Sequence, residues 1–131
     1  MEESKVNYVS RVSDNSLPTV CTKEVVVFPK MNASIQIGRQ QSIKALEAAD
    51  KEYSGKVLVV CQRNFDDEVL TQDKVYTIGT VCQIESKRQD NNFIRVIVKG
   101  LYRAKIKSFG LVDGIYMSSS LKLDDIMGDS K

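Results

Sequence analysis

Apolar and polar residues alternate along most of this chain with the period of two that is typical of β-strands. The run "VLVVC" is continuously apolar instead, which predicts a central strand that is covered on both faces. The two longest alternating segments are separated by a short polar turn and are expected to form a hairpin. Strands are therefore predicted over residues 19–21 and 25–28 (two halves of one extended segment), 33–37, 56–62, 75–86, 93–109 and 115–123.

The alternation also predicts which face of each long strand points inward. Between the strands, residues 63–74 are polar and are expected to form a surface loop. Gly100 is a candidate site for a bulge that would reverse the faces beyond it. The predicted inward residues are Tyr76, Ile78, Cys82 and Ile84; then Ile94, Val96, Val98, Tyr102, Ala104 and Ile106; and finally Ile115, Met117, Leu121 and Leu123.

The period changes to that of a helix between Arg39 and Tyr53, where Ile43, Leu46 and Tyr53 fall on one side. Ser54-Gly55 supplies a helix stop. A single helix cannot cover both faces of a parallel sheet, so the predicted fold is mostly β with one main helix (α+β). Its sheet should be largely antiparallel and partly closed.

Length and composition fit one globular domain, since 42% of the 131 residues are apolar and 27% are charged. We expect residues 1–16 to be a flexible leader, 17–123 the folded domain, and 124–131 a polar tail that leads to further parts of a longer polypeptide. The net charge of +2 gives no strong field for nucleic acid or anionic lipid.

Several kinds of chemistry are missing from the sequence. It has no histidine, and no nucleotide-binding, zinc-protease or nucleophile-elbow motif occurs in it. We therefore expect no catalytic, metal-binding or cofactor-binding residue. The three cysteines lie in or beside apolar runs and are expected to be reduced, and no export signal or membrane span is visible, so a cytoplasmic location is expected.

Five blocks of sequence, in order, carry a family resemblance: "LPTVCTKEVVVFPKM", "IGRQQSIKALEAA", "VLVVCQ", "YTIGTVCQI" and "IRVIVKGLYRAKI". Together they resemble the N-terminal, substrate-recognition domain of Lon-type ATP-dependent proteases, from Leu17 to about Phe109. The resemblance implies a PUA-like pseudo-barrel of about six strands. It also implies recognition of unfolded or damaged proteins and a part in assembling a hexamer, while ATP, Mg²⁺ and a Ser-Lys peptidase dyad belong to other parts of the parent protein. This chain alone should cut nothing.

Two sets of candidate site residues follow. Pro29 must end or turn an extended segment, which would leave an apolar surface for extended client chains, formed by Val27, Phe28, Pro29, Met31 and Ile35. In the alternative interpretation, Phe28 is a core residue and Pro29 a turn former. By the resemblance, Arg39, Lys44 and Glu47 would contact neighbouring subunits, although a charged helix face is also an ordinary solvated surface.

A rival hypothesis is a stand-alone PUA-like RNA-binding module. If no bulge intervened, the strand from Arg95 to Lys107 would carry a basic stripe, with Phe93 and Leu101 between its charges. The stripe would consist of Arg95, Lys99, Arg103, Lys105 and Lys107. A third possibility, a small-molecule adaptor, would call for an aromatic cage, and the absence of tryptophan counts against it.

Overall fold

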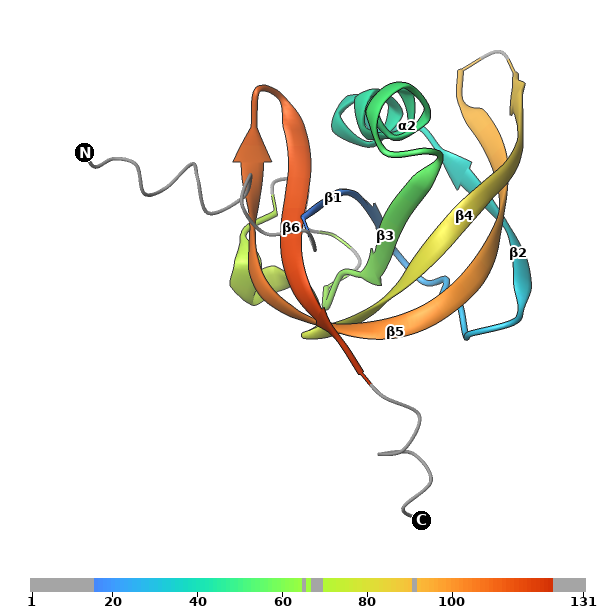
Figure 1. The fold of residues 1–131 in the computed structure, drawn as a ribbon. Helices are drawn as coiled ribbons and strands as arrows, with labels where there is room; N and C mark the ends of the chain where they lie inside the picture. Colours follow the sequence, from blue (N-terminus) through green and yellow to red (C-terminus); the bar gives the residue numbers. More distant parts are fainter. Residues whose placement is uncertain (1–15, 65, 67–69, 91, 124–131) are drawn as a thin grey trace.

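A curled sheet with one α-helix packed against it forms the part of the chain described by the computed structural model, residues 16–64, 66, 70–90 and 92–123 (Figure 1). The expected leader and tail lie outside these residues, apart from Ser16. The elements in order are β1 (Leu17–Thr22), β2 (Asn32–Ile37), α2 (Gln40–Glu52), β3 (Lys56–Cys61), the 3₁₀ helix η1 (Gln72–Lys74), β4 (Ile78–Gln89), β5 (Ile94–Val112) and β6 (Ile115–Lys122).

The strands lie in the order β2-β5-β4-β3-β1-β6, and a further pairing of β5 with β6 closes the sheet into a barrel. The 19 residues of β5 make this closure possible, because its length lets it pair with β2, β4 and β6 in turn (Figure 1). β1 and β3 are parallel, whereas the other described pairings are antiparallel. The predicted fold class, a largely antiparallel pseudo-barrel with one main helix, is confirmed.

Two hydrophobic cores lie on opposite faces of the sheet. Along β3, Val57 and Val59 belong to the core under α2, and Leu58 and Val60 to the second core. All four side chains are buried, so the continuous apolar run is a central strand covered on both faces, as predicted.

A β-bulge at Leu101 moves β5 from one core to the other. Val81 pairs with Tyr102 while Cys82 pairs with Gly100, which leaves Leu101 as the extra residue. Before the bulge, Val96 and Val98 pack in the core under α2, and beyond it Ala104 and Ile106 pack in the second core. The bulge and the reversal expected near Gly100 are both present.

Helix α2 matches its predicted bounds, with Arg39 and Tyr53 as the flanking residues. Its end follows from positive φ angles at Ser54 (56°) and Gly55 (78°), which let the Gly55 N–H donate to the carbonyl of Ala49 at 2.8 Å. The buried face differs slightly from the expected one, because Ser42, Ala45, Leu46 and Ala49 are buried while Ile43 and Tyr53 are half-buried.

Three expectations, two about strands and one about a loop, are wrong. Residues 25–28 form no strand, although their apolar sequence pattern predicts one. β4 begins at Ile78, and both Tyr76 and Ile78 are exposed. Residues 63–74 are not all surface, since Leu70 is buried in the second core.

The inward face of β6 is also the opposite of the predicted one. Tyr116, Ser118 and Ser120 are buried, whereas Leu121 is exposed. Tyr116 stacks on Phe109 at 5.1 Å between ring centroids, and Ser118 accepts a hydrogen bond of 2.7 Å from the hydroxyl of Thr19. Ser118 is thus satisfied by a partner on another strand, which a polar/apolar pattern cannot indicate.

Candidate functional site

The segment Lys23–Phe28, here called the strap, links β1 toward β2 without joining the sheet. Two threonine hydroxyls hold it, Thr22 donating to the carbonyl of Val25 and Thr80 to that of Val27, both at 2.6 Å. Val27 is only 2% exposed and packs in the core under α2. Because neighbouring side chains of an extended segment point in opposite directions, Val26 and Phe28 are turned outward.

A tight turn over Phe28–Met31 fixes the end of the strap. Met31 donates its N–H to the Phe28 carbonyl at 3.0 Å, and Lys30 has a φ of 71°, as at the third position of a type II turn with proline at the second. The Lys30 N–H donates to the Gly100 carbonyl at 2.8 Å, and the Gly100 N–H to the Met31 carbonyl at 2.9 Å. The turn is thereby attached to β5 beside its bulge.

Between the strap and the start of β4 lies a cavity of about 500 Å³, here called the apolar groove. Its most exposed large apolar side chains come from two distant parts of the chain: Val26 (52%) and Phe28 (49%), and Tyr76 (46%) and Ile78 (44%). The guanidinium of Arg103 lies over the Phe28 ring at 5.4 Å and that of Arg63 over the Tyr76 ring at 4.9 Å. Exposed apolar side chains gathered at a cavity are typical of a binding surface.

The strap also offers backbone hydrogen-bonding groups. Within the described residues, the N–H groups of Val26 and Phe28 donate no hydrogen bond. An extended segment with unpaired backbone groups next to an apolar cavity can take up another extended chain.

The structure exposes only part of the predicted apolar surface. Phe28 is exposed, so its interpretation as a core residue is wrong, while Pro29 and Met31 are half-buried at the turn. Val27 and Ile35 belong to the core under α2 and are nearly fully buried, so Val27 contributes only to the floor of the groove and Ile35 does not line it. The sequence reasoning missed Val26, Tyr76, Ile78 and Arg103 as groove residues. The alternation of side chains along an extended segment could have indicated Val26, which lies two residues before Phe28. The same pattern gave no signal for Tyr76 and Ile78, because it predicts them on the inward face.

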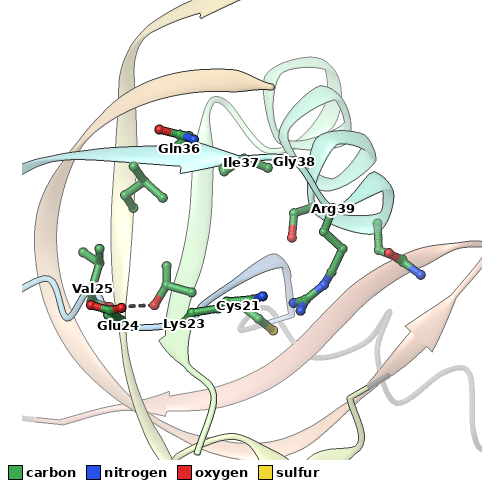
Figure 2. Close-up of a pocket in the computed structure, with 12 residues that line it drawn as sticks. Cys21, Lys23, Glu24, Val25, Gln36, Ile37, Gly38 and Arg39 are labelled. Atoms are coloured by element: carbon green, nitrogen blue, oxygen red, sulfur yellow. Dashed lines mark hydrogen bonds between the residues drawn. The ribbon is translucent and has the colours of Figure 1, made fainter. Parts of the chain in front are cut away.

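A second cavity, of about 800 Å³, lies on the other side of the strap at the beginning of α2 and is here called the helix-start cavity. Figure 2 shows Arg39 reaching from the start of the helix toward Cys21, with Glu24 and Val25 across from it. Arg39 donates from Nη2 to Oε1 of Gln62 at 3.2 Å. Arg39 is therefore not on the outer helix face where it was predicted with Lys44 and Glu47, both of which are exposed.

The basic stripe proposed for RNA binding is divided. The bulge at Leu101 lies between Lys99 and Arg103, so the two ends of the stripe face opposite sides of the sheet. Arg103 is directed to the groove, and Arg95 lies over the Phe93 ring at 5.8 Å. The condition on which the RNA-binding stripe depended is not met.

Burial raises the pKa of two thiols, Cys21 and Cys82, to about 12; a nearby Arg39 partly opposes the rise at Cys21. The described cysteines are all free, as expected, although Cys61 is only half-buried.

These raised pKa values predict a loss of stability in alkali. In the unfolded chain the thiols ionise near pH 9, whereas in the folded chain they keep their protons to about pH 12. The unfolded state thus binds fewer protons above pH 9, and stability present below pH 9 is lost progressively as pH rises toward 12. Urea unfolding at pH 8 and pH 10.5 measures this loss, and Cys82→Ala should reduce it. An equal loss in wild type and variant would contradict a role for Cys82.

Within the described residues, no three potential ligands among Asp, Glu, Cys and His are grouped so as to hold a metal ion, and no helix has the length and hydropathy needed to span a membrane.

The family model described as "ATP-dependent protease La (LON) substrate-binding domain" matches residues 16–125. Similar curated proteins include the Lon protease of Endomicrobium trichonymphae, 32% identical over 110 residues, which is 83% of this chain and 14% of that protein. The Lon protease of Acinetobacter baumannii is 35% identical over 94 residues, 70% of this chain and 12% of that protein. The chain thus spans only about one seventh of the length of these relatives.

Two solved structures share the fold. The N-terminal domain of the Mycobacterium avium complex Lon protease superposes with a TM-score of 0.66 at 19% identity, covering 83% of this chain and 55% of that one. A Lon N-terminal domain protein from Xanthomonas campestris gives a TM-score of 0.62 at 14% identity, covering 83% of this chain and 60% of that one.

Proposed function

Because this chain belongs to the family of ATP-dependent protease La (LON) substrate-binding domains, we propose that its apolar groove binds extended, apolar segments of unfolded or damaged proteins. The observation that carries this proposal is the meeting of Val26 and Phe28 with Tyr76 and Ile78 around one groove, each about half-exposed. Leaving four large apolar side chains together in water is unfavourable unless a ligand covers them.

The groove suits an extended chain more than a folded partner. A client strand lying along the strap can accept hydrogen bonds from the free N–H groups of Val26 and Phe28, whatever its sequence. Its apolar side chains would enter the groove, where contact is not sequence-specific. Arg103, held over the Phe28 ring, adds a positive charge beside the groove and should favour clients with an acidic residue next to the apolar segment.

Replacing Phe28 by serine tests the site. The exposed half of the ring should be buried by a client, so its removal should cost about 1.4 kcal/mol of binding, a roughly tenfold rise in Kd. The measurement is fluorescence anisotropy with a reduced, carboxymethylated protein that cannot fold. Because Phe28 is not part of either core, urea unfolding of the variant should resemble that of wild type.

Leu111→Ser provides a matched control. Leu111 is 51% exposed, as apolar as Phe28, and lies outside the groove on the β5–β6 hairpin. We expect the client's Kd to be unchanged in this variant. Equal effects of the two substitutions, or none in Phe28→Ser, would show that clients bind elsewhere.

The rest of the family's activity is proposed for a longer parent protein. In it, this chain would be a non-catalytic module of a cytoplasmic, ATP-dependent serine endopeptidase, with ATP, Mg²⁺ and the peptidase dyad bound outside the chain. The parent would be a homohexamer. Lys44 and Glu47, exposed on α2, remain the candidate contacts to neighbouring subunits, while the cavity-facing Arg39 is a weaker one.

A further inference from the structure

The helix-start cavity contains polar groups that have no partner in the described chain. Ser42 lines this cavity and is 1% exposed, and its buried hydroxyl has no hydrogen-bond partner among the described residues. A buried hydroxyl without a partner costs free energy, so in native proteins it usually marks a place that something else occupies.

The start of α2 adds further donors at the same place. The helix has no side-chain cap and no acidic residue in its first turn. Ser42 and Ile43 donate their N–H groups to the carbonyl of Arg39, both at 3.0 Å. The N–H groups of Gln41, which lines the cavity, and of its neighbour Gln40 are left without an acceptor in the helix. Free N–H groups and the positive end of the helix dipole attract an anion.

Arg39 supplies a full positive charge beside these donors. The guanidinium of Arg39 has five N–H donors, and the hydrogen bond to Gln62 uses one of them. Among the described residues, the cavity wall also carries the negative charge of Glu24, and the thiol of Cys21 is neutral at physiological pH because burial raises its pKa. Glu24 would repel a dianion more strongly than a single carboxylate.

We propose that the helix-start cavity binds a carboxylate group that is attached to a small apolar body. The carboxylate would accept hydrogen bonds from the Ser42 hydroxyl, the first free N–H groups of α2 and Arg39. The cavity, about 800 Å³, is larger than a bare carboxylate needs, and Val25, Ile35 and Ile37 provide apolar wall for the attached body. The carboxylate can be that of a free small acid or of a peptide's last residue.

The proposal is tested by NMR titration of the 131-residue chain with isovalerate, with N-acetylvaline and with N-acetylvaline amide. We expect saturable shifts centred on the amides of Gln40, Gln41 and Ser42, with the uncharged amide at least tenfold weaker than N-acetylvaline. Tighter binding of isovalerate would assign the site to free acids, and tighter binding of N-acetylvaline to chain ends. Phosphate binding more tightly than either, or shifts that are linear or equal for acid and amide, would overturn the proposal.

Two variants separate the site from general charge effects. Ser42→Ala should weaken carboxylate binding about tenfold. It should not lower the melting temperature of the free protein, because the hydroxyl has no partner to lose. Lys44→Ala removes a positive charge two residues away without touching the cavity, and binding should be unchanged. If Lys44→Ala weakens binding as much as Ser42→Ala, or if Ser42→Ala has no effect on binding, the assigned site is wrong.

Discussion

Replacing Tyr116 by alanine is expected to lower the free energy of unfolding by about 4 kcal/mol. Tyr116 is among the largest fully buried side chains, stacks on Phe109 in the second core, and its hydroxyl accepts a hydrogen bond from the Leu70 N–H at 3.2 Å. Truncation would leave a cavity and an unpaired N–H together. Urea unfolding followed by circular dichroism measures the change.

The size of this effect distinguishes the observed face of β6 from the one predicted by its pattern. Leu121, predicted to face inward, is exposed, so Leu121→Ala should change the free energy of unfolding by less than about 0.5 kcal/mol. Tyr116→Phe keeps the ring and loses only the bond to Leu70, with an expected cost of about 1–2 kcal/mol. A larger loss for Leu121→Ala than for Tyr116→Ala would mean that β6 is turned over in solution.

Replacing Gly100 by alanine is expected to cost about 3 kcal/mol and to remove client binding. A Cβ on Gly100 would lie 2.3 Å from the carbonyl oxygen of Phe28 and 3.2 Å from Cα of Pro29. These atoms are backbone, so the methyl group can be accommodated only if the turn moves away from β5 and its two hydrogen bonds to Gly100 are strained. Phe28 would then leave its position beside the groove.

Gly110→Ala is the matched control in the same strand. A Cβ there meets no atom within 4 Å, so the substitution should be neutral or slightly stabilising through the unfolded chain. Both variants should be compared in urea unfolding and in the anisotropy assay at a temperature where both are folded. A Gly100→Ala variant as stable as Gly110→Ala, with client affinity retained, would show that the turn does not pack on β5.

The groove is a consequence of how the strap and the barrel are built. The strap is held by threonine hydroxyls at Val25 and Val27 instead of by a neighbouring strand. The start of β4 is therefore left uncovered, and the same uncovered face gives the groove its exposed Tyr76 and Ile78. The proposed client site and the proposed carboxylate site lie on either side of one segment, with Val25 lining both cavities.

Local pattern was sufficient for much of the fold. The helix from Gln40 to Glu52, its stop at Ser54-Gly55, the doubly covered β3 and the bulge beside Gly100 follow from periodicity and from the conformations that glycine permits. These features depend on residues close together in the chain. They were therefore predictable from the sequence by itself. The five sequence blocks, taken in order, also predicted the family.

Only the tertiary structure decided which side chains face a ligand. Tyr76 and Phe28 are exposed where the strap and the beginning of β4 face the groove, and Val27 is buried where its carbonyl accepts a hydrogen bond from Thr80 of β4. Ser118 and Ser42 are both buried, but Ser118 has a partner on β1, whereas Ser42 has none among the described residues. Exposure and hydrogen-bond satisfaction depend on what distant segments bring into contact, and one strand's alternation carries no information about them.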